Sequence, residues 1–200
     1  MNLTNRQKAI LVGTLLGDAS LQKTGMKNAR LRLEHGIKQK EYLLFKGEQF
    51  PKLFSTKPEF IERIHPLTRQ IYGYWRWQSN ASPVLGKWRE LFYGKGKKYI
   101  PENLSEILTD PLSLAVWYMD DGFYDPVQKH SFIYLGRVTR PEAEVSKEAI
   151  LKNFNIVTKV YDKKEKGFAL FFSVSETRKL HKAISEHILP SLGYKISLTP

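Results

Sequence analysis

The sequence has no cysteine, no long apolar run and comparatively few acidic residues, and each shortage excludes a class of protein. Without cysteine the chain has no disulfides and no cysteine-zinc sites, so a metal must be held by oxygen or histidine ligands. No apolar stretch approaches the roughly 18–20 residues that span a bilayer, and the first residues lack the small-residue cleavage site of a signal peptide. We therefore expect an intracellular protein that enters no membrane, in the cytoplasm of a prokaryote or in an organelle.

The shortage of acidic residues is the strongest signal in the composition. In a chain of 200 residues, 32 Lys and Arg stand against 20 Asp and Glu, and the formal net charge is +12. So basic a chain indicates a polyanionic partner, usually nucleic acid, although charge that only keeps a protein soluble would give the same composition. Nucleic acid is favoured because the basic residues stand beside aromatic residues in strand-like segments. A membrane surface is disfavoured because no long basic amphipathic helix is present.

Two apolar segments carry the start signals of buried helices. The first, residues 4–19, opens with Thr4 as N-cap and with Gln7 completing a capping box. The second, residues 110–122, opens with Asp110 as N-cap and a proline in the first turn, and it ends in glycine. Because the apolar residues of the first segment lie almost all round the helix, we expect a buried helix, and the second segment follows the same plan.

Each of these segments has an aspartate next to its last residue, Asp18 or Asp121, although a helix C-terminus carries partial negative charge and an acid there costs about 0.3–1 kcal/mol. A divalent cation reverses the balance, because Mg²⁺ (or Mn²⁺) takes oxygen ligands and binds carboxylates together with substrate phosphates. If the helices pack side by side through Gly13, Gly17 and Ala115, both carboxylates reach one place, where metal ions could activate a water. Each motif alone is more simply a turn, but the pair favours a metal site.

The two halves of the chain repeat this plan. Asp18 and Asp121 lie about half the chain apart, and each is followed by strand-like segments, an amphipathic helix and a lysine shortly before an isoleucine. Such a repeat predicts two similar lobes related by a pseudo-two-fold axis. We expect an N-terminal lobe at residues 1–93, a connection at residues 94–109 and a C-terminal lobe at residues 110–200.

The two closing lysines, Lys98 and Lys195, are candidate catalytic residues. A lysine near a scissile phosphate can polarise a water or offset the negative charge that develops there. Most lysines in so basic a chain are solvated surface groups, and only the repeated position distinguishes these two. Their spacing alone leaves both interpretations open.

Between the motif helices and the lysines, polar and apolar residues alternate with the period of two that is typical of half-buried strands. The segments are residues 29–35, 68–78, 129–139, 156–161 and 168–174. An amphipathic strand would explain each alternation by itself, but the polar face carries Arg, Gln and Tyr, which suit base edges and phosphates in a major groove. The candidate DNA-binding residues are Arg30, Arg32, Glu34, Gln70, Tyr72, Tyr74, Arg76, Gln78, Lys97, Arg137 and Lys159.

With both motifs and both lysines in place, the sequence resembles the LAGLIDADG homing endonucleases. The two nine-residue motifs are LVGTLLGDA at residues 11–19 and LAVWYMDDG at residues 114–122. In that family the eighth motif position binds the metal, which here is Asp18 or Asp121, and Asp120 is the less important neighbour. The stretch before the second motif and the C-terminal residues resemble the monomeric subgroup typified by I-SceI, in which the two closing lysines belong to the active sites.

The resemblance implies an α+β fold, a duplicated αββαββα saddle whose two pseudo-two-fold-related lobes present antiparallel sheets to DNA. It implies a monomer that cuts both strands of a long double-stranded DNA site by metal-dependent hydrolysis. Asp18, Asp121, Lys98 and Lys195 would be the catalytic residues, and the two aspartates would bind Mg²⁺ (or Mn²⁺). Intron RNA is a further expected partner, because some family members assist splicing as maturases.

One position departs from the family pattern and keeps a second hypothesis open. Relatives commonly carry a polar residue, often Gln, in the strand before the next helix of the second half, where this chain has Gly136 or Arg137. A weakened second active site would nick DNA, and the comparable residue of the first half is Glu34. The alternative to an endonuclease is a non-cleaving relative that acts as an RNA splicing maturase or a DNA-binding regulator. The retained aspartate and lysine pairs argue against it, because binding alone does not need them.

Overall fold

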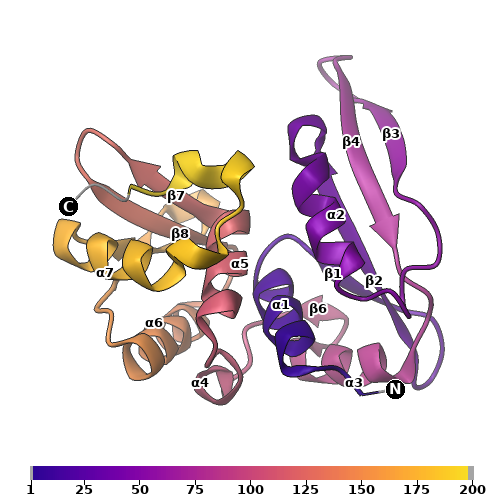
Figure 1. The fold of residues 1–200 in the computed structure, drawn as a ribbon, viewed down its shortest axis with the longest axis horizontal. Coiled ribbons are helices and arrows are strands. Elements are labelled where there is room, and N and C mark those ends of the chain that lie inside the picture. The colour runs from indigo at the N-terminus through magenta and orange to yellow at the C-terminus, as the bar shows by residue number, and fades with distance from the viewer. Residues whose placement is uncertain (1, 198–200) are drawn as a thin grey trace. The chain divides into compact units, whose positions relative to one another are not determined.

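The computed structural model describes residues 2–197, which form two compact units (Figure 1). One unit consists mainly of residues 18–91, and the other contains residues 3–17 and the chain from Phe92 onward. The first helix, α1 (Asn5–Leu16), is therefore grouped with the second half of the chain. The lobe boundaries expected from the repeat stay a prediction. None of the helices in the described part of the chain is long and apolar enough to cross a membrane.

The first unit is an antiparallel sheet with a helix packed on it. Its strands pair in the order β1-β2-β4-β3. They are β1 (Ser20–Lys23), β2 (Ala29–Gly36), β3 (Glu59–Ile64) and β4 (Ile71–Gln78). Helix α2 (Lys40–Glu48) lies along β2 and β4, as Figure 1 shows, and a Cβ on Gly47 would collide with the Trp77 ring. Helix α3 (Pro83–Phe92) follows the sheet in the chain.

The second unit contains a sheet of the same design and the two motif helices. Its strands pair in the order β7-β8-β10-β9, again antiparallel, and α6 and α7 pack on them, while α1 packs on α5. The elements after Phe92 are β5 (Tyr93–Gly94), β6 (Lys97–Lys98), α4 (Leu104–Ile107), α5 (Pro111–Asp121), β7 (Gly122–Asp125), β8 (His130–Gly136), α6 (Arg140–Phe154), β9 (Lys159–Asp162), β10 (Phe168–Phe172), α7 (Val174–Ile184) and a 3₁₀ helix (Pro190–Lys195).

The order of elements confirms the duplicated α+β fold. The first half runs α1-β1-β2-α2-β3-β4-α3 and the second runs α5-β7-β8-α6-β9-β10-α7, so each half reads αββαββα. The strand expected at residues 29–35 is confirmed, whereas two other strands begin later than expected, at Ile71 and Lys159. Strands β8 and β10 end early because Thr139 and Ser173 serve as N-caps of the helices that follow.

The expected helix starts are also confirmed. The Thr4 side chain accepts a hydrogen bond from the Gln7 N–H at 3.2 Å, and the Gln7 side chain accepts one from the Thr4 N–H at 2.9 Å. Asp110 caps α5 through its carboxylate. Gly122 ends α5 with an ordinary φ of −77°, so it is not a left-handed cap. Glycine is needed there because a Cβ would collide with the carbonyl and ring of Tyr118.

Candidate active site and nucleic-acid interface

The two motif helices, α1 and α5, pack on each other through glycine. A Cβ on Gly13 would collide with the Ser113 carbonyl and the Val116 side chain. A Cβ on Gly17, the residue that ends α1, would collide with the side chain of Asp120. A glycine inside a helix costs about 1 kcal/mol relative to alanine. The close approach of the two backbones is the physical reason that α1 carries Gly13 at this position.

The three acidic residues of the motifs lie at the C-terminal ends of these helices. Asp121 is the last residue of α5 and is half-buried, and Asp120 precedes it with its side chain against Gly17. Asp18 follows Gly17 by one peptide bond and is exposed. The assignment of the metal to Asp18 and Asp121, and of a lesser role to Asp120, stays a prediction.

Lys98 and Lys195 reach equivalent backbone groups at the ends of the two motif helices. The Lys98 Nζ donates to the Gly17 carbonyl at 2.6 Å. The Lys195 Nζ donates to the Met119 carbonyl at 2.6 Å and to the Asp120 carbonyl at 3.2 Å. Gly17 and Asp120 are the residues immediately before the two motif aspartates. Both lysines therefore contact the same motif position, the residue before the aspartate.

The helix ends attract these ammonium groups for an electrostatic reason. The last four carbonyls of a helix have no partner within the helix, and they carry its partial negative charge. A lysine that donates to them satisfies the carbonyls and offsets the unfavourable placement of an acid at the same end. Lys98 is carried by β6, where it pairs with Tyr93 of β5, whereas Lys195 ends the 3₁₀ helix.

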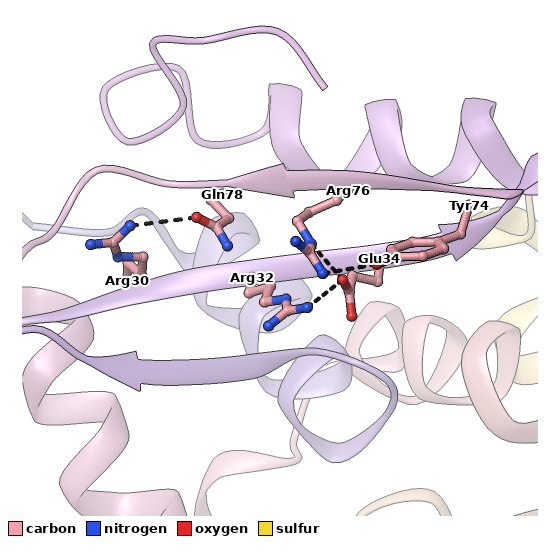
Figure 2. A network of polar contacts seen from close by, with 6 residues as sticks. All are labelled: Arg30, Arg32, Glu34, Tyr74, Arg76 and Gln78. Atoms are coloured by element: carbon pink, nitrogen blue, oxygen red, sulfur yellow. Dashed lines mark hydrogen bonds and ion pairs between the residues drawn. The ribbon is translucent and has the colours of Figure 1, made fainter. Parts of the chain in front are cut away.

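A charged network covers the polar face of the first sheet (Figure 2). Glu34 on β2 accepts a hydrogen bond from Arg32 at 2.6 Å and one from the Arg76 Nε at 2.5 Å, and Arg76 also donates to the Tyr74 hydroxyl at 2.9 Å. The sheet register places Glu34 opposite Arg76. The three charged side chains are only 19% to 33% exposed, so their contacts are less screened than those of an ordinary surface pair.

The charge state of Glu34 follows from its two arginine partners. Burial acts to raise the pKa of Glu34, but hydrogen bonds and charge from Arg32 and Arg76 outweigh burial, and the pKa is lowered from its ordinary value. Glu34 is thus a carboxylate at neutral pH that orients two guanidinium groups. Arginine guanidinium groups are the commonest specific partners of guanine in a major groove.

A second polar pair lies beside the network and opens onto a recess. Arg30 donates to the Gln78 side chain at 3.4 Å, as the left of Figure 2 shows. These two residues line a recess of about 280 Å³ together with Arg76, Lys57 and Asn80. Apart from the acidic Glu59, the charged and amide side chains that line this recess fit the chemistry of phosphates and base edges.

Gln70, Tyr72 and Lys97 are candidate residues that lie outside this network, whereas Tyr74 belongs to it. Gln70 precedes β4 and is exposed, and Tyr72 is exposed near the start of β4 with its ring centroid 5.7 Å from that of His65. The Tyr74 ring lies 5.1 Å from the Arg63 guanidinium. Lys97 is exposed on β6.

The outer face of the second sheet is aromatic. Its rings belong to three strands and lie with centroids 5.1–6.1 Å apart. The members are His130, Phe132 and Tyr134 of β8, Tyr161 of β9 and Phe171 of β10. We call these five residues the aromatic surface. The alternation within residues 129–139 is a sequence signal for this surface, because the three β8 residues share one face, although none of the five is among the predicted DNA-binding residues.

Basic residues border the aromatic surface. The Lys163 Nζ lies 4.3 Å above the Phe132 ring, within the range of a cation–π contact. Arg137 follows β8 and Lys159 begins β9, and both are exposed. Gly136 has a φ of +67°, a conformation that side chains rarely adopt, so this position resists replacement by Gln. The backbone strain that a side chain would suffer at Gly136 is a physical reason for the departure from the family pattern.

Two buried helices pack on each other through glycine, and each ends beside an aspartate and a lysine. The same basic chain carries two antiparallel sheets of one design. These features define a duplicated protein with two motifs. The chain belongs to the LAGLIDADG DNA endonuclease family, whose model matches residues 8–180. This match confirms the family predicted from the motifs. The narrower resemblance to the I-SceI subgroup stays a prediction.

A RecA protein, an mRNA maturase and an intron-encoded endonuclease are similar to this chain in sequence. A "Protein RecA" of Mycobacterium gastri is 28% identical over 97% of this chain and 48% of its own length. The "Cytochrome b mRNA maturase bI2" of Debaryomyces hansenii is 27% identical over 94% of the chain and 72% of its own length. The "Probable intron-encoded endonuclease 1" of Wickerhamomyces canadensis is 24% identical over 97% and 85%. The chain spans about half the length of the RecA relatives that it matches.

Solved structures support the fold. The homing endonuclease I-WcaI, bound to its DNA recognition sequence, matches with a TM-score of 0.91 at 23% identity, over 100% of this chain and 89% of that chain. The complex of I-DmoI with DNA and Ca matches with a TM-score of 0.56 at 13% identity, over 94% and 96%. At these identities the matches establish the architecture alone.

Proposed function

We propose that this chain is a site-specific endonuclease that hydrolyses both strands of double-stranded DNA at a long recognition site with Mg²⁺ (or Mn²⁺). One observation carries the proposal above all. Two lysines from different parts of the chain donate to equivalent carbonyls, one before each motif aspartate, at the ends of helices that pack on each other. A protein that only bound DNA would not need this repeated arrangement.

The donor set at the motif ends fits a divalent cation. Carboxylates that lie at negative helix ends repel one another, and a hard cation with oxygen ligands removes the repulsion. Asp18 and Asp121 would hold the metal, which when bound activates a water and stabilises the leaving oxygen. Lys98 and Lys195, fixed beside the same motif ends, would offset negative charge at the scissile phosphate. Each lysine and aspartate pair would serve one DNA strand.

The DNA-binding surface in this proposal is formed by the outer faces of the two sheets, the polar face of the first and the aromatic surface of the second. The formal net charge of +12 attracts the phosphate backbone. The residues around Glu34 and the aromatic surface would contact base edges, since major grooves admit β-ribbons. We further propose that the chain acts as a monomer, that residues 1–93 and 110–200 form the two lobes joined by residues 94–109, and that it works in a prokaryotic cytoplasm or an organelle.

The test begins with a target. Purified protein and Mg²⁺ are mixed with a random DNA library, and the cleaved sequences are recovered. On the selected target, Asp18→Asn and Asp121→Asn should each bind DNA as the wild type does and lose cutting of one strand. Glu90→Gln, which removes an exposed acid of α3, is the charge-matched control and should cut normally. Full cutting by both aspartate variants, or no cleaved sequence at all, would refute the proposal.

A maturase is the second candidate, and the similarity to a maturase of Debaryomyces hansenii favours it specifically. Its substrate would be intron RNA held on the same basic surfaces. Purified protein that stimulates splicing of an intron RNA and cuts no DNA would establish this function in place of the endonuclease. Protein that does both would have the two activities together.

A further inference from the structure

Three buried side chains form a polar cluster behind the second motif helix. Tyr118 of α5, Ser131 of β8 and His181 of α7 are 0%, 0% and 2% exposed. The Tyr118 and Ser131 hydroxyls lie 3.2 Å apart, and the His181 Nε2 lies 3.3 Å from the first and 3.2 Å from the second. Buried polar groups are retained where each finds a partner. This cluster has partners on its far side as well.

The far side of the cluster is the backbone around Lys195. The Tyr118 hydroxyl donates to the Lys195 carbonyl at 2.8 Å. The Ser197 N–H donates to the His181 Nδ1 at 3.0 Å, and the Ser197 carbonyl lies 3.2 Å from that same nitrogen. The backbone of Lys195 and that of Ser197, two residues later, are thus tied to α5 and α7.

The hydrogens in this cluster can be assigned from their partners. A hydroxyl has one proton, and the Lys195 carbonyl, which has none, needs the proton of Tyr118. Because Nδ1 of His181 accepts the Ser197 N–H, a neutral imidazole carries its proton on Nε2 and can donate to Ser131 or Tyr118. Ser131 then donates to Tyr118, and each side-chain proton of the cluster has an acceptor. Burial lowers the pKa of His181 from 6.5 to about 4, which agrees with a neutral ring.

The first half of the chain holds its lysine in another way. Leu15 of α1 occupies the motif position that Tyr118 occupies in α5, and it is apolar and fully buried. Lys98 lies in β6 and is held by strand pairing with Tyr93. Lys195 lies at the end of a 3₁₀ helix of six residues, a kind of element that is weakly held by its own hydrogen bonds. The backbone of the second lysine is tied instead to the side-chain cluster of Tyr118, Ser131 and His181.

We propose that Tyr118, Ser131 and His181 are positioning residues that hold the backbone of Lys195 so that its Nζ stays on the carbonyls that precede Asp121. This inference rests on the proposed endonuclease function and deepens it. Because its three side chains are buried, the cluster acts through Lys195 in this proposal. Its loss therefore weakens the active site that contains Lys195 and leaves the one that contains Lys98 intact.

The decisive variant is Tyr118→Phe, which removes the hydroxyl and keeps the ring. Single-turnover cleavage is followed for each DNA strand separately on a target selected with the wild type. We expect a loss on the order of tenfold for the strand that Lys195→Met also fails to cut, an unchanged rate for the other strand, and accumulation of nicked DNA. Tyr124→Phe is the matched control, since this half-buried tyrosine packs against His181 at 5.0 Å between ring centroids and should cut both strands normally.

A double variant separates positioning from general loss of structure. If Tyr118 acts through Lys195, Tyr118→Phe combined with Lys195→Met should cut no more slowly than Lys195→Met alone. Additive losses, equal losses on both strands, or an unchanged rate in Tyr118→Phe would overturn the inference. Ser131→Ala supplies the same comparison if Tyr118→Phe fails to fold, with a smaller loss on the same strand. A wild type that cuts no DNA would instead refute the proposed function.

Discussion

The two halves of the molecule bring a lysine to the same backbone position by different means. Lys98 is fixed by a short strand pair, and Lys195 is fixed by a 3₁₀ helix tied to the cluster around His181. The carbonyl that each lysine contacts is nonetheless equivalent, one residue before Asp18 or Asp121. The motif ends constrain where the ammonium group must lie, and they leave open how the chain brings it there.

The two sheets differ more than the helix ends do. Both have the same antiparallel strand order, yet the first carries arginines oriented by Glu34 and the second carries the aromatic surface. The inner faces pack on helices and are mostly apolar in both halves, with Ser131 and His35 as buried polar exceptions, whereas the outer faces have no such constraint. Surfaces that contact a partner can therefore diverge while the frame that carries them stays the same.

The largest effect on cleavage should come from replacing either of the two lysines. Lys98→Met and Lys195→Met should each lower cleavage of one strand by about 10²-fold or more, because each removes a group that stabilises charge in the transition state. The strands should be opposite, and denaturing gels with each strand labelled in turn would show it. If both variants spare the same strand, the equivalence of the two halves is wrong.

The buried histidine makes the second half sensitive to acid. Between pH 6.5 and about 4 the unfolded chain binds a proton at His181 that the native chain does not, so the free energy of unfolding falls as the pH is lowered through this window. The loss should reach about 2–3 kcal/mol. Lys129 and Arg178, which line the adjoining recess, would repel a protonated ring and act in the same direction.

Urea unfolding at pH 7, 6, 5 and 4 would measure this dependence. In His181→Gln the part of the slope that His181 causes should disappear, although the variant is less stable at neutral pH. An identical slope in wild type and variant would show that His181 does not titrate in this range.

The glycine contact between α1 and α5 should respond to a single methyl group. Gly13→Ala should lower the free energy of unfolding by about 2 kcal/mol, because the new Cβ meets the Ser113 carbonyl, which cannot move aside as a flexible side chain would. Gly25→Ala is the control, since nothing lies within 4 Å of a Cβ there. Thermal unfolding of both variants gives the comparison, and equal melting temperatures would contradict it.

The smallest effect should come from the outer face of the first sheet. Glu34→Gln removes the charge that orients Arg32 and Arg76 and adds one net positive charge. We expect tighter binding to random DNA and a specificity ratio that falls several-fold, with relaxed base preference in one half-site only. Binding titrations at two salt concentrations, with Glu62→Gln of β3 as the charge-matched exposed control, would test it. A change in both half-sites would show that the network does not act locally.

The sequence predicted the parts of the site that depend on neighbours in the chain. The capping box at Thr4, the cap at Asp110 and the alternation at residues 29–35 are local patterns, and the structure has all three. The repeat also marked Lys98 and Lys195 as candidates, because a repeat is visible without knowing any contact, and their catalytic role stays a prediction. The alternation placed the ends of β8 and β10 too late, because it continues to Thr139 and beyond Ser173, which cap the helices that follow.

What the sequence determined by itself is the repeat, the two motifs, the basic charge and the helix starts, because each follows from short-range chemistry or from composition. Only the tertiary structure decided which distant groups meet. Glu34 and Arg76 meet across a strand register, and Tyr118 and His181 meet although 63 positions separate them. No local pattern encodes such partners, because a buried polar group must be satisfied by whichever group packing places beside it.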